Sequence, residues 1–333
     1  MSAAAPAAVL VTGGSSGIGF ELARRFAEEG HPVVIAAYDI EKLESAAELL
    51  RDRVPGADIT TIAADLASEE GIYGLHRELR EKPRPIGILC ANAGVGSGGG
   101  DFAETELGKE LELIDLNVRG QVQLAKLLVR DMIETGGGKL LFTSSIAGLM
   151  PGPFEAVYAA SKAFVRSFAE ALRNELADKG IGVTSFMPGP TDTDFFHRAG
   201  MDETPAGRAR KDDPAQVADQ AYAALMADRH AVVTGSLKTR LQGGLAKMMS
   251  DPQRATLHRR QTEPFDRAAP APTPAPALAT AGLALIGTAA ALGAFAWARS
   301  RRAEAEIAAR THQRLDSDGH VVPQADFAVG TAG

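Results

Sequence analysis

A tyrosine and a lysine stand four positions apart in the stretch Tyr158-Ala-Ala-Ser-Lys162. In a helix this spacing places the phenol and the ammonium group on one face. A nearby cation favours the phenolate, so the tyrosine could exchange a proton at a pH well below its usual pKa of ~10. The pair therefore indicates general acid–base chemistry.

A second tyrosine, Tyr38, also has a lysine four residues later, at Lys42. The two tyrosines differ in what precedes them. Tyr158 has Ser145 thirteen residues earlier, whereas Tyr38 has Arg25 at that distance. The serine supplies a hydroxyl that could assist the reaction, so it favours Tyr158 as the acid–base group and leaves Tyr38 a binding or structural role.

A glycine-rich loop, Thr12-Gly13-Gly14-Ser15-Ser16-Gly17-Ile18-Gly19, follows an apolar run and opens an amphipathic stretch. Glycines allow a tight turn and let the backbone approach a pyrophosphate at a helix N-terminus. A plain glycine turn is the alternative. The strand–turn–helix setting favours a dinucleotide-binding loop.

The elements that must position these groups form an alternating pattern. Short apolar runs predict strands, and they are Ala8 to Thr12, Pro32 to Ala37, Asp58 to Ala63, Ile86 to Ala91, Lys139 to Thr143, Gly182 to Met187 and Ala231 to Thr234. Amphipathic stretches between them predict helices, including Ile18 to Glu29, Ile40 to Arg53, Leu107 to Glu134 and Val157 to Lys179. The last of these helices should end in a left-handed cap at Gly180. Apolar strands separated by helices predict a doubly wound parallel α/β sheet, Rossmann-like, with ligands beyond its carboxyl ends.

In this setting the chain resembles the short-chain dehydrogenase/reductases of the roughly 250-residue type, over about residues 7 to 240. Six motifs carry the resemblance in order, and they are the TGxxxGxG loop at Thr12 to Gly19, Asn92-Ala93-Gly94, Asn117, Ser145, the Tyr158/Lys162 pair, and Pro188-Gly189 followed by Thr191. The resemblance implies an NAD(P)-dependent enzyme that moves a hydride between nicotinamide and a carbonyl or alcohol carbon.

The resemblance also implies roles for the catalytic residues. Tyr158 would protonate the substrate oxygen in reduction, and Lys162 would lower the pKa of Tyr158 and hold the nicotinamide ribose. Ser145 would hydrogen-bond the substrate oxygen as charge develops; Ser144 is the neighbour that could be confused with it. Asn117 would anchor a water linking Lys162 to solvent, or would be a helix-bending amide without a chemical role.

The implied cofactor contacts are Gly13, Ser15, Ser16, Gly17, Ile18, Gly19, Tyr38, Asp65, Leu66, Asn92, Ala93, Gly94, Lys162, Pro188, Gly189 and Thr191. NAD-preferring relatives usually carry an acid where this chain has Ala37, and NADP-preferring ones often carry a base at Ser16 or Tyr38. The missing acid and the nearby hydroxyl groups favour NADP over NAD. Asp39 lies two residues beyond the usual acid, so it more plausibly begins the next helix.

The segment from 191 to 213 occupies the family position of a substrate lid. Phe195, Phe196 and Met201 favour a hydrophobic, even lipid-like, ketone, although a lid that packs only on its own domain explains them equally well. His197 is expected on the lid surface.

Composition excludes several other functions. A formal charge of −7 offers no basic field for nucleic acid, and the single Cys90 excludes an internal disulfide framework. No Cys/His spacing suggests a metal site. Two alternatives stay open: a non-catalytic dinucleotide-binding scaffold or sensor, and a sugar-nucleotide epimerase or dehydratase, whose loop is usually TGxxGxxG. Relatives also suggest a homo-oligomer.

The sequence divides into a catalytic domain (1–245), a C-terminal extension (246–267), a Pro/Ala linker (268–276), a transmembrane helix (277–298) and a polar tail (299–333). The fourth segment has 22 uncharged residues, ends near Trp297 and is followed by Arg299. A helix of that length can span a bilayer, while a soluble helix docked on another subunit is the alternative. Without a signal peptide, the catalytic domain is expected in the cytoplasm, anchored to a membrane.

Overall fold

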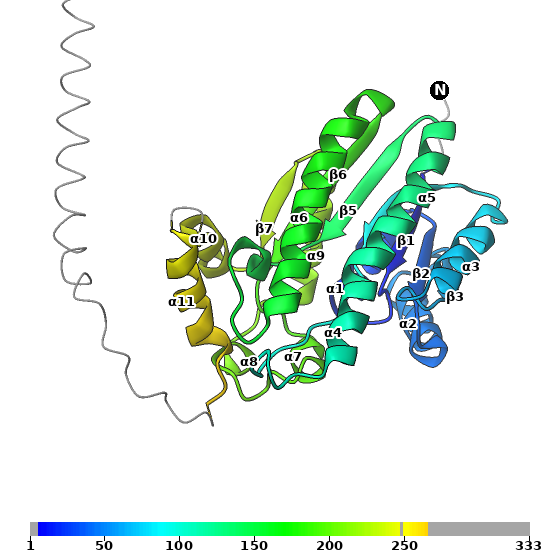
Figure 1. The fold of residues 1–333 in the computed structure, drawn as a ribbon. Coiled ribbons are helices and arrows are strands. Elements are labelled where there is room, and N and C mark those ends of the chain that lie inside the picture. The colour runs from blue at the N-terminus through cyan, green and yellow to red at the C-terminus, as the bar shows by residue number, and fades with distance from the viewer. Residues whose placement is uncertain (1–5, 247–248, 266–333) are drawn as a thin grey trace, which may run out of the picture. The chain divides into compact units, whose positions relative to one another are not determined.

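A seven-stranded sheet forms the centre of the computed structural model, which describes residues 6–246 and 249–265. The strands are β1 (Ala8–Thr12), β2 (Val33–Ala37), β3 (Ile59–Ala63), β4 (Ile86–Ala91), β5 (Gly138–Thr143), β6 (Ile181–Pro188) and β7 (Ala231–Thr234). All neighbours pair in parallel, in the order β3-β2-β1-β4-β5-β6-β7 (Figure 1). The predicted doubly wound sheet is therefore confirmed. Because the strand order reverses between β1 and β4, the crevice there is where such folds bind ligands.

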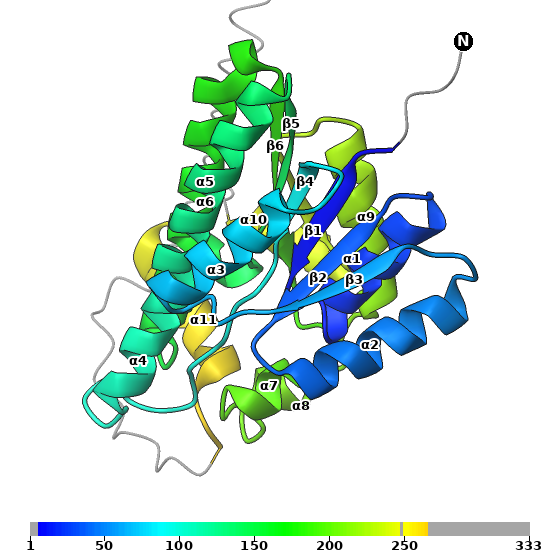
Figure 2. The same ribbon diagram turned by 90° about the vertical axis from the view of Figure 1, so that its right-hand side faces the viewer.

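Helices cover both faces of this sheet. The helices are α1 (Gly17–Glu28), α2 (Ile40–Arg53), α3 (Glu69–Arg80), α4 (Leu107–Ile114), α5 (Gln121–Glu134), α6 (Ala156–Leu176), α7 (Phe195–Arg198), α8 (Pro205–Arg208), α9 (Pro214–Met226), α10 (Leu237–Ala246) and α11 (Asp251–Thr262). One apolar core joins the sheet to α1, α2 and α9, and another joins it to α3, α5 and α6. Figure 2 shows these two layers on opposite sides of the strands. Neighbouring strand residues such as Val9 and Leu10 belong to different cores, as the alternation of a pleated strand requires.

The sequence predicted one continuous helix from Leu107 to Glu134, and that prediction is wrong in one detail. A π-helical turn, Asp115–Gly120, separates α4 from α5. At Gly120 a Cβ would lie 2.1 Å from the carbonyl oxygen of Leu66, so the chain approaches the segment after β3 too closely for a side chain there. Asn117 lies within this π turn and is fully buried.

The end of α6 agrees with the sequence. The helix gives way to a single 3₁₀ turn, Ala177–Lys179, and the chain leaves through Gly180 in the left-handed region, with φ of 70°. Glycine adopts that conformation without the steric cost of a Cβ.

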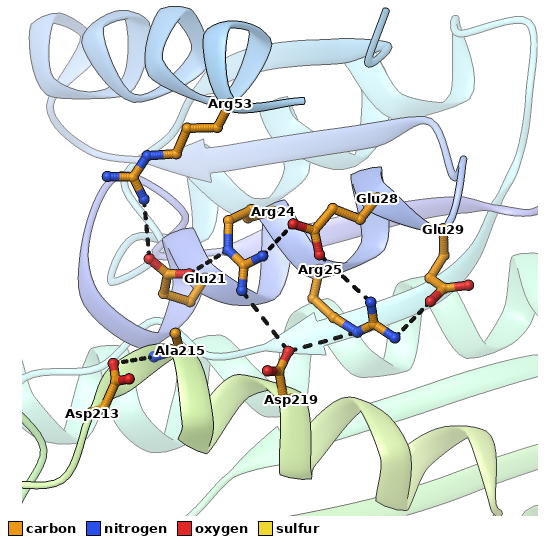
Figure 3. Close-up of polar contacts among 9 residues, drawn as sticks. All are labelled: Glu21, Arg24, Arg25, Glu28, Glu29, Arg53, Asp213, Ala215 and Asp219. Atoms are coloured by element: carbon orange, nitrogen blue, oxygen red, sulfur yellow. Dashed lines mark hydrogen bonds and ion pairs between the residues drawn. The ribbon is translucent and has the colours of Figure 1, made fainter. Parts of the chain in front are cut away.

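An ion-pair network joins α1 to α9 on one outer face. Arg24 and Arg25 both approach Asp219, at 3.9 and 3.6 Å, and also pair with glutamates of their own helix (Figure 3). Arg53 of α2 reaches Glu21 at 3.4 Å. These groups are partly exposed, so we expect the network to contribute little to stability.

Among the described residues, no helix is both long enough and apolar enough to cross a membrane. The predicted linker, membrane helix and tail, 268–333, lie outside the described residues. Part of the predicted C-terminal extension is described, and it forms α11.

Candidate active site

A pocket opens at the carboxyl ends of the strands, where the topology leads us to expect a ligand. It is lined by every predicted cofactor contact and by Ser145, Tyr158 and Lys162. Asn117 is the exception: its neighbour Leu116 lines the pocket, while Asn117 lies behind it, fully buried.

The glycine loop has the shape that a pyrophosphate requires. Gly13 and Gly17 adopt φ of 67° and 56°, which side chains strongly disfavour. At Gly19 a Cβ would lie 2.1 Å from the Gly13 carbonyl oxygen, so the loop closes only with glycine there. The N-terminus of α1 has no side-chain cap from Ser16 and no acidic residue in its first turn. Its free N–H groups can therefore bind phosphate oxygens, and the residues fit a dinucleotide.

The adenosine end of the pocket is formed by the segments after β2 and β3. Tyr38 is 79% exposed at this edge. Asp39 caps α2, because its carboxylate accepts a hydrogen bond of 3.1 Å from the backbone N–H of Lys42. This confirms that Asp39 begins the helix. Asp65 accepts from the N–H of Ala67 at 3.0 Å, which fixes the turn after β3.

The Asn92-Ala93-Gly94 segment ties three strand ends together. The Asn92 amide donates to the Thr12 carbonyl at 3.1 Å, and its oxygen accepts from the Thr143 hydroxyl at 3.2 Å. The Thr12 hydroxyl accepts from the N–H groups of Asn92 and Ala93, both at 3.0 Å. At Gly94 a Cβ would lie 2.9 Å from Asn117 Oδ1 and 3.1 Å from Lys162 Nζ, so a side chain there would force these groups to shift.

Tyr158, Ser145 and Lys162 meet at the centre of the pocket. Ser145 and Tyr158 both line the pocket, and the Ser145 hydroxyl acts to lower the pKa of Tyr158. Lys162 Nζ lies 5.8 Å from the centre of the Tyr158 ring and donates to the Thr143 carbonyl at 3.1 Å. Ser144 instead donates its hydroxyl to the Lys162 carbonyl at 2.7 Å. That bond occupies Ser144, so the geometry favours Ser145 as the serine that meets a substrate.

Burial shifts the pKa values of both Tyr158 and Lys162, an effect that the sequence did not indicate. We expected Lys162 to lower the pKa of Tyr158, but burial raises it, the charge of Glu155 raises it further, and the Ser145 hydroxyl opposes both only in part. Burial also lowers the pKa of Lys162 from 10.5 to about 8. The sequence expectation counted the cation and omitted desolvation, which disfavours both charged forms. The effect of Lys162 on Tyr158 stays a prediction.

Asn117 holds the backbone of the pocket wall. Its oxygen accepts from the Val95 N–H at 3.0 Å, and its amide donates to the Val95 carbonyl at 2.9 Å and to the Ser161 hydroxyl at 3.2 Å. The π turn therefore serves to bring this amide to Val95. The proton-relay role of Asn117 stays a prediction.

The segment from 191 to 213 forms one wall of the pocket. Phe195 lies 5.3 Å from the Tyr158 ring, centre to centre, and Phe196 and Met201 also line the cavity. His197 points away, exposed, and bonds Asp202 at 2.8 Å. Figures 1 and 2 show α7 and α8 at the same end of the sheet as α11.

Known proteins match this architecture and its motifs. The family described as short chain dehydrogenase matches residues 7–204, more than half of the 333-residue chain. The chain belongs to the short-chain dehydrogenase family. Sulfoacetaldehyde reductase 2 of Chromohalobacter salexigens is 34% identical over 216 residues, covering 64% of this chain and 84% of that protein.

Solved structures of this family are also similar. A short-chain dehydrogenase from Sphingobium yanoikuyae in complex with NADPH has a TM-score of 0.63 and 32% identity, covering 68% of this chain and 87% of that one. The bulky-bulky ketone specific alcohol dehydrogenase from Comamonas testosteroni has a TM-score of 0.62 and 26% identity, covering 81% and 98%. The chain is accordingly an NAD(P)-dependent oxidoreductase that acts on carbonyl and alcohol groups, and the enzymatic interpretation is confirmed.

Sequence reasoning missed one side of the short-chain dehydrogenase pocket. Glu155, Arg198, His258, Gln261 and Thr262 all line it. Glu155 stands three residues before Tyr158, which is a weak signal that could have been noticed. Nothing in the sequence pairs it with His258, 103 residues away.

Proposed function

We propose that this enzyme reduces hydrophobic ketones, including bulky or lipid-like ones, with NADPH. One observation carries the proposal: Met150, Phe195, Phe196 and Met201 line the pocket, and the Phe195 ring lies 5.3 Å from the Tyr158 ring, centre to centre. Aromatic and thioether side chains bind apolar groups of varied shape. The similar Comamonas enzyme is named for bulky ketones, which supports the same substrate class.

The residues of the chain supply binding and proton transfer. NADPH, bound along the glycine loop, supplies the hydride. Tyr158 donates its phenolic proton to the substrate oxygen, while Ser145 donates a hydrogen bond to that oxygen as negative charge develops. Lys162, held by the Thr143 carbonyl, is placed to bind the nicotinamide ribose and to stabilise the phenolate that remains.

The reductive direction is supported by the protonation of Tyr158. Burial and the Glu155 charge raise its pKa, so the phenol carries its proton at neutral pH. A protonated phenol is the form that can act as an acid toward a carbonyl oxygen.

The preference for NADP is supported by the groups around the loop. Ser15 and Ser16 line both the main pocket and a second cavity beside the glycine loop, in which Lys42 and Arg53 stand alongside Glu21 and Glu41. Hydroxyl groups and basic side chains can bind a 2′-phosphate. Ala37, at the end of β2, contributes no carboxylate that would repel it.

A panel of ketones tests the substrate class. We expect oxidation of NADPH with bulky apolar ketones and a higher melting temperature in the presence of NADPH, since binding stabilises the folded state by mass action. Turnover restricted to small polar carbonyls would contradict the proposal.

A small aldehyde with an anionic group is the second candidate, and one observation favours it. Arg198 lines the pocket, and its guanidinium forms no ion pair or hydrogen bond with the residues that the structure describes. A free guanidinium can bind a sulfonate or carboxylate. The similar sulfoacetaldehyde reductase 2 is named for such an aldehyde. In the panel, Arg198→Ala would then abolish turnover of anionic aldehydes and spare neutral ketones.

Homo-oligomerisation is proposed from the apolar face of α4. Leu107, Leu111 and Ile114 follow helical spacing and are 67%, 50% and 39% exposed. Such a stripe indicates a buried contact surface. We assign it to a second copy of this chain, and Leu111→Glu should lower the mass measured by sedimentation.

Membrane anchoring through 277–298, with the catalytic domain in the cytoplasm, also remains a proposal from the sequence. Its support is the length of the uncharged stretch and the arginines after it. The full chain should sediment with membranes, and a chain ending at Arg267 should not. A full chain that stays in the high-speed supernatant without detergent would contradict the anchor.

A further inference from the structure

A buried contact between a histidine and a carboxylate lies beside Tyr158 and joins two distant parts of the chain. His258 of α11 bonds Glu155 through Nε2, and both side chains are almost fully buried. Glu155 stands at the N-terminal cap of α6, three residues before Tyr158, and its charge acts on Tyr158. The other nitrogen of His258, Nδ1, has no partner among the described residues, so Glu155 alone anchors the imidazole.

The loop between the two catalytic residues is held by the same helix. Arg254 donates to the Leu149 carbonyl at 2.9 Å, and Thr262 donates to the Pro153 carbonyl at 2.8 Å. The guanidinium of Arg259 lies 5.2 Å from the centre of the Phe154 ring. Helix α11 thus contacts successive parts of the segment 149–155, which connects Ser145 to Tyr158.

One residue of this loop needs such support. Phe154 has φ of 63°, a left-handed conformation that non-glycine residues rarely adopt. A strained backbone persists only where its surroundings determine it. The contacts from α11 hold the backbone in this conformation just before α6 begins.

Helix α11 also holds the opposite wall of the pocket. It packs against α8, and beyond its end the N–H of Phe265 donates to the Glu203 carbonyl at 3.1 Å. Arg208 of α8 lies 4.8 Å from the centre of the Phe265 ring. Because α11 contacts both the loop and the lid, it sets the distance between the two walls around Tyr158.

We propose that α11 completes the active site, with His258 as a positioning residue that holds the Glu155 carboxylate beside Tyr158. This rests on the proposed role of Tyr158 as the acid. Several titratable or charged groups lie on the elements around Tyr158. They are Lys162 on α6, Glu110 on α4, Arg198 on α7, His258 on α11, and the pairs Arg254–Asp251 and Arg259–Glu263 on or next to α11. The charge of Glu155 opposes the ionisation of Tyr158 and raises its pKa.

Tyrosine NMR tests the contact without any substrate. The chain has four tyrosines, so labelling their Cζ atoms gives a simple spectrum in which the Tyr158 signal is the one missing from Tyr158→Phe. We expect His258→Leu and Glu155→Gln each to shift the Tyr158 signal. His76→Leu is the matched control, because it removes a histidine–carboxylate pair of 2.7 Å between α3 and α5 and should leave Tyr158 unchanged.

Kinetics with a ketone found in the panel test the consequence. His258→Leu should lower kcat by about ten- to a hundredfold through misplacement of Tyr158, with NADPH affinity unchanged. His258→Gln should restore most of kcat, because its amide can still donate to Glu155. In Glu155→Gln the loss of negative charge lowers the pKa of Tyr158, so the alkaline limb of the kcat profile should move to lower pH.

The outcomes separate this proposal from the proposed function. If Tyr158→Phe keeps full turnover, the role of Tyr158 as the acid is wrong. If Tyr158→Phe is inactive while His258→Leu and Glu155→Gln keep the wild-type kcat, pH profile and Tyr158 signal, the positioning role is overturned. Should His258→Leu fail to fold, Glu155→Gln still decides, because it keeps the volume of the site while removing the charge beside Tyr158.

Discussion

The two halves of the pocket are built in different ways. The cofactor half is made by the ends of β1 to β4 and the glycine loop, where short local segments follow each strand. The substrate half is assembled from the start of α6, the lid helices α7 and α8, and α11, with Glu155 and His258 meeting across 103 residues. The first half depends on backbone geometry that a few residue types satisfy. The second depends on how remote helices pack.

Because the two halves of the pocket are built differently, we expect them to control different properties of the enzyme. Backbone N–H groups at the start of α1 bind phosphate whatever substrate is used, so changes there should affect the cofactor alone. The side chains around Tyr158 decide both the substrate and the protonation of the acid. The following substitutions compare the two halves, in order of expected effect.

The largest effect should come from Tyr158→Phe. Loss of a positioned acid lowers kcat by ~10²–10⁴, while the dissociation constant for NADPH should change little because the phenol acts on the substrate. Steady-state kinetics and cofactor titration measure the two quantities. Tyr38→Phe, at the cofactor edge, is the control and should keep turnover. The reverse pattern in these two variants would show that the halves have been assigned wrongly.

Lys162 lies where the halves meet, and Lys162→Met should change how stability depends on pH. Burial lowers the pKa of Lys162 from 10.5 to about 8, so the unfolded chain binds one more proton than the folded chain between these values. The free energy of unfolding of the wild type should therefore rise with pH across that window. The lowered pKa corresponds to a rise of about 3 kcal/mol in the free energy of unfolding across this window. Lys162→Met lacks the titrating group and should not show this rise.

Urea unfolding of the cofactor-free protein at pH 7, 8, 9 and 10 measures this difference. If the free energy of unfolding changes with pH in the same way for the wild type and for Lys162→Met, the folded lysine keeps its usual pKa.

Cofactor choice should respond only to changes in the first half. Ala37→Asp introduces a carboxylate at the end of β2 that can accept from a 2′-hydroxyl and repel a 2′-phosphate. Tyr38→Arg offers a guanidinium to that phosphate. A charge-assisted bond of ~1.5–3 kcal/mol corresponds to ratios of about ten to a hundredfold, toward NAD in the first variant and toward NADP in the second. Ratios of kcat/KM that stay constant in both would place the 2′ site elsewhere.

The smallest effect should come from outside both halves. Asp219→Asn removes the carboxylate that α9 offers to Arg24 and Arg25 (Figure 3). Exposed ion pairs contribute ~0–1 kcal/mol, so the free energy of unfolding should fall by no more than that, and kcat should stay constant. A loss of several kcal/mol would show that this network is a main attachment of α9.

The sequence by itself determined the sheet, its order of elements and the cofactor loop. Strands such as Ala8–Thr12 are apolar throughout because both faces are covered, and that pattern is visible in one dimension. Gly13, Gly17 and Gly19 were identifiable because only glycine satisfies those backbone conformations and close contacts. The Tyr158/Lys162 pair was visible because helical spacing places both on one face.

Only the tertiary structure decided the environment of that pair. Spacing within a helix shows which groups are neighbours, but not how much water reaches them, and here burial is the largest cause of the raised pKa of Tyr158. The π turn at Asn117 ends at Gly120, which lies against Leu66, a contact between distant segments. The Glu155–His258 pair likewise exists only because α11 folds back over the loop before α6, and no local pattern in the sequence encodes that packing.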